Sequence, residues 1–293
     1  TEGSKVTSRM IRDRLFAENE TNVAIKVKEA EGKDAFEVGG RGELQLGVLI
    51  ENMRREGFEL SVSRPRVLYK KGEGDQILEP VEEVVIDVDD AFSGSVVEKL
   101  SSRKGEMIEM KPSSGGKTRL VFYVPSRGLI GYQSEFATDT KGSGVLNRIF
   151  HAYVPYKGEM TDKRSGALIA TDPGEAVAYA LWNLQDRGTM FINPQQKVYS
   201  GMVIGENAKQ GDLEVNVLKG KQLTNIRASG TDEAIRLTPP RILTLEDMIT
   251  YVGEDELVEV TPKSLRLRKK FLDSNDRKRF GRSKEAKFDF VQE

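Results

Sequence analysis

The stretch GRGELQLGVLIENMRREGFELSVSRPRV, residues 40–67, predicts a helix followed by a returning strand. Its large apolar residues recur at i, i+3, i+4 and i+7, which is the spacing of one face of a helix. These residues are Leu46, Leu49, Ile50 and Met53. Gly57 is expected to end the helix, because glycine readily adopts the conformation that follows a last helical turn. The segment FELSVSRPRVLYK then returns as a strand.

Upstream of this helix, residues 9–38 predict one more helix and two strands. The first strand alternates apolar and smaller or charged residues from Val23 to Val27, and AFEV at residues 35–38 supplies the second. The order helix, strand, strand, helix, strand is a split βαβ arrangement whose opening strand is missing. Together with the absence of an initiator Met, this gap predicts that the chain begins inside a longer protein.

The next part of the chain repeats this arrangement with all of its elements. A strand, a helix that Asp90 can cap, a hairpin around SSGGK, a second helix and a last strand follow one another. They are expected at residues 79–88, 92–105, 106–125, 126–144 and 145–156. Residues 70–75, KKGEGD, are the expected linker between the two arrangements.

From about Lys157 the pattern changes to short strands separated by glycine-rich turns. One clear helix is predicted over residues 171–189, with Pro173 in its first turn and Gly188 at its end. The predicted fold class is therefore α+β. Two ferredoxin-like (split βαβ) domains, at 1–74 and 75–155, precede a β-rich C-terminal domain at 156–293 with one prominent helix.

The composition limits the classes of protein to which the chain can belong. A hydrophobic content of 38% with 31% charged residues is typical of a soluble globular protein with a heavily charged surface. No apolar run reaches about 18 residues, so no membrane span is expected. The absence of Cys excludes disulfides and thiol nucleophiles and fits a cytoplasmic protein.

Motifs that could carry enzyme chemistry are weak. KPSSGGKT, residues 111–118, ends like a phosphate-binding loop, but Lys111 stands where that loop needs glycine. A strand rather than a helix follows it, so a tight hairpin is predicted. The lone His151 lies in a period-two pattern, which favours a strand histidine over a catalytic base or a metal ligand. We therefore expect no catalytic residue, metal or cofactor in this chain.

Basic charge is concentrated near the C-terminus. The net charge is -1, yet residues 263–284 hold ten Lys or Arg against two Asp, which leaves 35 basic and 44 acidic residues elsewhere. In an extended conformation Leu265 and Leu267 lie on one side and Arg266 and Arg268 on the other, before Lys269 and Lys270. Such a surface suits phosphate neutralisation, with an affinity that falls as salt rises. The alternative is a solvated terminus.

A long polar segment precedes this tail. In KGKQLTNIRASGTDEAIRL, residues 219–237, Leu223 and Ile226 are the only large apolar side chains between Gln222 and Glu233, and they fit neither helix nor strand. A surface loop is predicted, either as a solvated connection or as a binding element. Its basic and neutral donors suit structured RNA, with its splayed bases and 2′-hydroxyls.

Several long strings resemble translational GTPases, and most closely the BipA/TypA family. Residues 40–67 resemble the third domain of these proteins, and VPSRGLIGYQSEFATDTKGSG, residues 124–144, is similar to their fifth-domain motif. LTNIRASGTDEA and ELVEVTPKSLRLRKKFL, residues 223–234 and 256–272, resemble the family's own C-terminal domain. The resemblance covers nearly the whole chain in one collinear order.

The resemblance implies a monomeric, cytoplasmic factor that binds the 70S ribosome in the manner of elongation factor G, linked to large-subunit assembly and stress adaptation. The parent protein would hydrolyse GTP, with GTP and Mg held in a domain outside these residues. The loop at 219–238 would reach toward the peptidyl transferase centre and the acceptor end of an A-site tRNA. With the basic tail on 50S rRNA, the expected RNA-contacting residues are Lys219, Lys221, Asn225, Arg227, Ser229, Thr231, Arg266, Arg268, Lys269, Lys270, Arg277, Lys278 and Arg279.

Some features depart from the family pattern and leave alternatives open. Gln45 stands where the family usually shows His, which we interpret as a polar exchange on the helix surface. Residues 280–293 match the family poorly, and the sequence assigns them no role. The alternatives are a fragment of an elongation factor 4-like protein, a protein-interaction module without RNA binding, and an independent enzyme.

Overall fold

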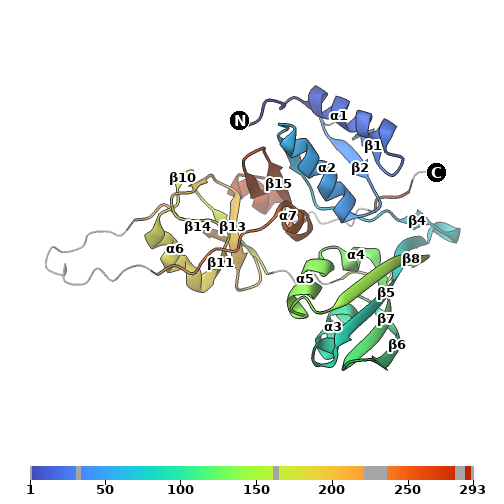
Figure 1. Ribbon diagram of the computed structural model, residues 1–293. Helices are drawn as coiled ribbons and strands as arrows, with labels where there is room; N and C mark the ends of the chain where they lie inside the picture. Colours follow the sequence, from blue (N-terminus) through green and yellow to red (C-terminus); the bar gives the residue numbers. More distant parts are fainter. Residues whose placement is uncertain (1, 31–33, 161–164, 221–235, 281–287, 292–293) are drawn as a thin grey trace. The chain divides into compact units, whose positions relative to one another are not determined.

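The computed structural model describes residues 2–30, 34–160, 165–220, 236–280 and 288–291 (Figure 1). It mixes helices with several sheets, so the predicted α+β class is confirmed. The chain forms two compact units. The first comprises Thr1–Arg64 and Lys163–Lys284, and the second comprises Pro65–Asp162 and Glu285–Glu293. The predicted division into three domains stays a prediction.

The second unit is built around the predicted β-α-β-β-α-β sequence of elements. They are β5 (Ile77–Asp89), α3 (Asp90–Ser102), β6 (Glu106–Ser113), β7 (Lys117–Pro125), α4 (Ser126–Leu129), α5 (Tyr132–Asp139) and β8 (Val145–Pro155). β5 pairs with β7 along one edge and with β8 along the other, and β6 lies beyond β7, all antiparallel. The sheet order β8-β5-β7-β6 is that of a split βαβ unit.

Alternating side chains place the core of this unit on one face of the sheet. Val84, Ile86 and Val88 of β5 are fully buried against residues of α3 and α5, such as Leu100 and Phe136. The sheet therefore has one face covered by helices, as period-two alternation requires.

Two details of the second unit refine the sequence-based expectations. KPSSGGKT forms the β6–β7 turn, with Gly115 and Gly116 at positive φ, so the predicted hairpin is confirmed. The single helix predicted over residues 126–144 is two helices, because Gly131 adopts a φ of 76° between α4 and α5. The expected linker contains β4 (Lys70–Lys71), which pairs with β5, and a short 3-10 turn at Glu73–Asp75.

The N-terminal part of the first unit contains α1 (Ser8–Thr21), β1 (Lys26–Glu29), β2 (Phe36–Gly39) and α2 (Glu43–Arg55). The predicted helical face of α2 is confirmed, since Leu49 and Met53 are buried in a core with Ile25 and Phe58. Gln45 accepts a hydrogen bond from the Arg41 amide at 2.7 Å, so this residue fixes the glycine corner that begins the helix.

The strand that follows α2 pairs with the C-terminal half of the chain. β3 (Leu60–Val62) runs antiparallel to β15 (Glu256–Val260), as the end strand of a seven-stranded sheet. The sheet order is β14-β9-β13-β16-β15-β3, with β11 also paired to β13. Its other strands are β9 (Ala167–Ala170), β11 (Gly188–Met190), β13 (Met202–Asn207), β14 (Leu213–Val215) and β16 (Leu265–Lys269).

The central strands β9 and β13 of this sheet are buried on both faces. Ile169 and Val203 belong to one core, which α7 (Leu245–Tyr251) covers, whereas their neighbours Leu168 and Ile204 belong to a second core with α6 (Ala178–Leu184). Because successive residues of a strand point to opposite faces, near-continuous apolar strands are the expected pattern for such a sheet. α7 begins with a capping box between Thr244 and Asp247.

The helix predicted over residues 171–189 is wrong in its extent. α6 contains only Ala178–Leu184, followed by a 3-10 turn at Gln185–Arg187. Before it, β10 (Gly174–Glu175) pairs with β12 (Lys197–Val198), and the Ala176 amide donates to the Gln196 carbonyl. These long-range backbone hydrogen bonds override the local helical periodicity, and Pro173 therefore precedes the helix.

The pairing of β3 with β15 predicts that distant parts of the first unit unfold together. Met53→Ala should lower the free energy of unfolding by about 2–5 kcal/mol, because it leaves a cavity at a fully buried site. In the same variant, hydrogen exchange should accelerate in both α2 and β15. The matched control is Val48→Ala, on the same helix but 53% exposed, which should stay within about 0.5 kcal/mol of the parent. Retained protection in β15 while α2 exchanges rapidly would contradict this account.

Candidate nucleic-acid interface

The predicted RNA-contacting residues fall into three segments: the polar loop, β16, and α8 (Ser274–Phe280) with the residues before it. In the loop, Lys219 is described and exposed. The other predicted loop residues, Lys221, Asn225, Arg227, Ser229 and Thr231, lie outside the described residues. Their RNA contacts remain predictions.

Both ends of the loop are fixed to the core that contains α6. On the entry side, Val217 is buried in this core, and the Leu218 amide donates to Asn216 Oδ1 at 2.8 Å. On the exit side, Leu237 packs against the same core, and the Thr238 amide donates to Gln185 Oε1 at 3.1 Å. The residues that flank the predicted loop therefore both pack on this core.

An exposed aromatic residue near these loop ends was not predicted. Trp182 of α6 is 43% exposed, and its ring lies 6.2 Å from that of Tyr179. Gln185, three residues further along, holds the exit side of the loop, and Arg187 and Arg236 are also exposed. The signal in the sequence was the only Trp of the chain, which sits in a short amphipathic helix. An exposed aromatic ring suits base stacking.

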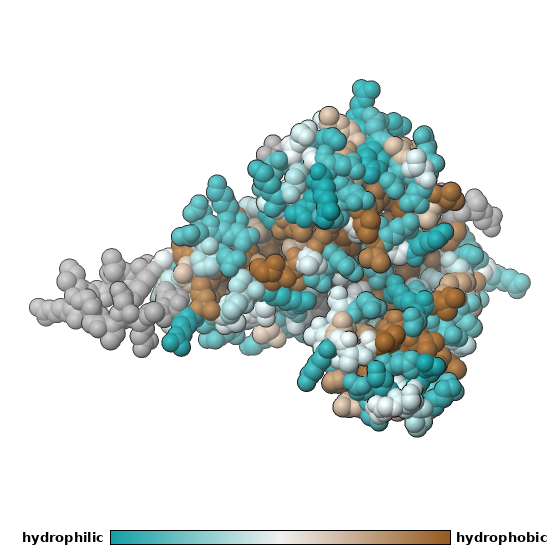
Figure 2. All heavy atoms as spheres, viewed as in Figure 1, coloured by the Kyte–Doolittle hydropathy of each residue, from teal (hydrophilic) through white to brown (hydrophobic). Residues whose placement is uncertain are grey.

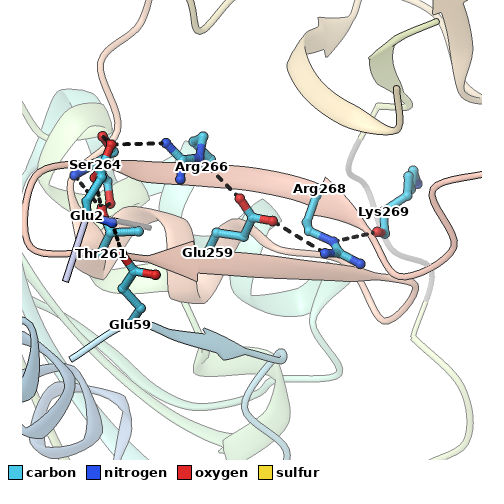
Figure 3. A network of polar contacts seen from close by, with 8 residues as sticks. All are labelled: Glu2, Glu59, Glu259, Thr261, Ser264, Arg266, Arg268 and Lys269. Carbon is cyan, nitrogen blue, oxygen red and sulfur yellow. Dashed lines mark hydrogen bonds and ion pairs between the residues drawn. The ribbon is translucent and has the colours of Figure 1, made fainter. Parts of the chain in front are cut away.

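The predicted alternation in β16 is confirmed, but its two arginines have partners within the protein. Leu267 is buried, while Arg266 and Arg268 point to the opposite face (Figure 3). Arg266 Nε lies 3.1 Å from Glu259 on β15, and Arg268 Nη1 lies 3.4 Å from the other oxygen of the same carboxylate. Both side chains are about three-quarters buried, so their positive charge mainly neutralises the Glu259 carboxylate.

Arg266 also belongs to a network that holds the N-terminal segment against the β15–β16 turn (Figure 3). The Glu2 carboxylate accepts hydrogen bonds from the hydroxyls of Thr261 and Ser264, and Arg266 Nη1 lies 3.8 Å away. The bond from Thr261 is the largest cause that lowers the pKa of Glu2. Glu59 in turn accepts from the backbone amide of Glu2. This arrangement is structural rather than a free phosphate site.

The structure contradicts the prediction that Lys269 contacts RNA. It shares the inward face of β16 with Leu265 and Leu267, and its side chain is only 3% exposed. The ammonium lies 2.6 Å from Asp212, 3.0 Å from Asp255 and 3.0 Å from Glu256. Burial alone would lower the pKa of this ammonium, but the carboxylates outweigh burial and raise it. Lys269 therefore has no accessible charge for a phosphate.

Arg277 of α8 is likewise engaged within the protein. Its Nη2 lies 2.6 Å from Glu214, and its Nη1 donates to the carbonyls of Phe271 and Leu272. The pKa of Glu214 is lowered, first by a hydrogen bond from Ser274 and then by Arg277. The predicted tail residues that remain exposed are Lys270, Lys278 and Arg279.

The face shown in Figure 2 and the described side chains hold no concentrated site. Hydrophilic and apolar residues are interspersed over the face shown in Figure 2. Among the residues placed by the structure, no group of three His, Asp or Glu side chains could hold a metal, and no helix is long and apolar enough to cross a membrane. His151 lies on β8 with its ring stacked 4.0 Å from that of Tyr123, which confirms a strand histidine.

Comparison with known families agrees with this architecture. Residues 76–164 match the family described as elongation factor G C-terminus, and residues 165–274 match the TypA/BipA C-terminal domain. The first match covers the β-α-β-β-α-β elements of the second unit, and the second covers all strands of the seven-stranded sheet except β3. This pair of domains defines the class of the chain, which joins an elongation factor G C-terminal domain to a TypA/BipA C-terminal domain.

Individual relatives are closely similar over almost the whole chain. The Escherichia coli (strain K12) protein named large ribosomal subunit assembly factor BipA is 51% identical over 283 residues, which is 96% of this chain and 46% of that protein. The Haemophilus influenzae and Synechocystis proteins of the same name are 50% and 48% identical, over 96% and 92% of this chain. The chain thus spans about half the length of these relatives. It belongs to the BipA/TypA family.

The buried ammonium of Lys269 gives a stability prediction. Lys269→Met should lower the free energy of unfolding by roughly 3–5 kcal/mol, because it strands buried Glu256 without its cation. Lys278→Met removes an exposed positive charge and should stay within about 0.5 kcal/mol of the parent. Urea titrations of the two variants measure the difference. Equal stabilities would show that the ammonium is not a structural cation.

Proposed function

We propose that this chain binds the RNA of the large ribosomal subunit through its polar loop, with the exposed part of the basic tail as a second contact. The observation that carries the proposal is the mounting of the loop. The residues on either side of it pack on a buried core and bond to Asn216 and Gln185. Anchored flanking residues keep a donor-rich segment at a defined place on the surface, as binding loops require.

The charges near the loop support a nucleic-acid partner. Lys219 and Arg236 lie at its two ends, and exposed Trp182 lies on the adjacent helix. Lysine and arginine neutralise phosphates, and an aromatic ring can stack on an unpaired base. We therefore propose that residues 219–238 contact 50S rRNA and the acceptor end of an A-site tRNA.

The tail is divided between two roles in this proposal. Arg266, Arg268, Lys269 and Arg277 are paired to carboxylates of the fold and serve its stability. Lys278 and Arg279 are exposed and would face rRNA, and Lys270 would do so although it also has a contact within the protein. This division predicts fewer phosphate contacts than the ten basic residues of the tail alone would indicate.

The wider role rests on the relatives, three of which carry the name large ribosomal subunit assembly factor. We propose that the parent protein is a cytoplasmic, monomeric GTP hydrolase that acts on the 70S ribosome and in large-subunit assembly and stress adaptation. GTP and Mg would be held outside the present residues. The TypA/BipA match over residues 165–274 favours this family over an elongation factor 4-like protein.

A protein-interaction module remains the second candidate, because one observation favours it. On the face of the second unit's sheet that the helices leave uncovered, Tyr123 stacks with exposed His151, and Ile149 is 67% exposed. Such a mixed aromatic and apolar surface suits a protein partner. Retention of the ribosomal partner after nuclease treatment would favour this function.

The RNA-binding proposal is tested with purified 50S subunits and three loop substitutions. Combined Lys219→Ala, Lys221→Ala and Arg227→Ala should weaken binding and reduce the slope of log affinity against log salt by about 2–3, since each lost phosphate contact removes close to one unit. The melting temperature should not change, because Lys219 is exposed and surface charges contribute little stability.

A matched control removes the same charge elsewhere in the first unit. Lys26, Lys197 and Lys209 are exposed, and their combined replacement by Ala should change the salt slope far less. Equal losses in the two triple variants would mean that only net charge matters. An unchanged affinity in the loop variant would exclude the loop from the interface.

A further inference from the structure

Residues Phe288–Val291, to which the sequence assigned no role, form an isolated parallel β-bridge with the second unit. The Tyr69 amide donates to the Asp289 carbonyl at 2.7 Å, and the Val291 amide donates to the Tyr69 carbonyl at 2.8 Å. These two bonds form a parallel bridge between Tyr69 and Phe290. The segment therefore pairs with the strand that leads into β4.

The pairing uses the free edge of that strand. Lys70 and Lys71 pair with Leu78 and Ile77 of β5. Because backbone groups of successive residues point to opposite sides of a strand, Tyr69 presents its amide and carbonyl away from β5. The terminal segment occupies this edge in the manner of β-strand addition, in which main-chain bonds give affinity and side-chain pockets give specificity.

The side chains of the segment also contact residues of the second unit. The Phe288 ring packs edge-on against Tyr69 and Tyr156, with centroid distances of 5.0 Å and 5.2 Å. Asp289 lies 3.0 Å from Arg66 Nη1, and Lys71 Nζ lies 5.5 Å from the centre of the Phe290 ring. Each of the three consecutive residues therefore has a partner on the unit.

The walls of this slot belong to the unit's own framework. The Tyr156 amide donates to the Ile77 carbonyl at 2.9 Å, and the Arg127 guanidinium lies 4.6 Å from the centre of the Tyr156 ring. Arg127 is itself held by Glu79, whose side chain is fully buried. The family-like SRGLIG motif thus positions Tyr156 through Arg127, independently of the terminal segment.

We propose that Tyr69, Tyr156, Arg66 and Lys71 form a binding slot for extended peptides with phenylalanine at alternate positions and a carboxylate between them. The chain's own Phe288–Val291 fills the slot in cis. A tethered segment has an effective concentration of about millimolar, so a competing peptide binds only when the terminal segment is displaced or altered.

The test uses the full chain and a labelled peptide that corresponds to residues 285–293, EAKFDFVQE. Phe288→Ala with Phe290→Ala in the full chain empties the slot. Fluorescence polarisation should then show peptide binding that is about tenfold or more tighter than to the parent chain, because the cis competitor is lost. Circular dichroism establishes that the variant is folded.

Variants of the peptide distinguish specific recognition from non-specific binding. Phe288→Ala in the peptide should weaken binding by about tenfold, because one ring contacts two tyrosines. Asp289→Asn should weaken it about two- to fivefold at low salt, as expected for a partly exposed ion pair. Val291→Ala alters an exposed side chain and serves as the control, with nearly unchanged binding.

Two outcomes would overturn the proposal. One is equal binding of the peptide to the parent chain and to the double variant, and the other is no binding at 1 mM, roughly the effective concentration in cis. A second measurement needs no added peptide. Hydrogen exchange at the Tyr69 amide should be about tenfold or more faster in the double variant, as for an amide that loses its local bond. An unchanged rate would contradict strand addition.

Discussion

The ammonium of Lys269 is the contact on which the C-terminal half of the chain depends. It joins Asp212, which precedes β14, to Asp255 and Glu256 at the start of β15. Asp212 also accepts from the Ala167 amide at the start of β9, and Glu256 accepts from the Gly253 amide. One buried cation therefore fixes four strands of the sheet. Since β14 leads directly into the polar loop, the base of the loop depends on the same contact.

The burial of Lys269 changes the role that can be assigned to the basic tail. A run of lysines and arginines usually indicates a polyanionic partner, yet here much of the charge neutralises carboxylates of the protein. Arg266 and Arg268 share Glu259, and Arg277 pairs with Glu214. Among the described residues predicted to contact RNA, the exposed cations are Lys219, Lys270, Lys278 and Arg279. The fold thus separates structural charge from charge that can meet a phosphate.

Sequence periodicity was sufficient for the locally determined elements. The apolar face of α2, the alternation in β5 and the glycine turn of the β6–β7 hairpin all depend on neighbouring residues, and all three were predicted. Contacts between distant residues were not predictable in this way. Neither the pairing of β3 with β15 nor the docking of Phe288 on Tyr69 and Tyr156 leaves a local pattern.

Lys269 is an intermediate case, because the period-two pattern that placed Leu265 and Leu267 inside also placed Lys269 on their face. Its charge suggested the surface, whereas its position in the strand indicated the core. The predicted polar loop lies mostly outside the described residues, whereas the packing of its flanking residues on the α6 core depends on residues distant in sequence. Whether the loop contacts RNA is therefore a question for binding experiments, because the sequence pattern alone does not answer it.

The acetylation rate of each lysine, measured by mass spectrometry on the free chain and on its complex with 50S subunits, distinguishes the buried lysine from the exposed ones. Lys219 and Lys278 should react readily in the free chain and be protected in the complex, whereas Lys269 should be unreactive in both. Modification of Lys269 at the rate of Lys278 in the folded chain would show that its ammonium is not buried among carboxylates. No protection of Lys219 on the subunit would show that the loop does not meet RNA.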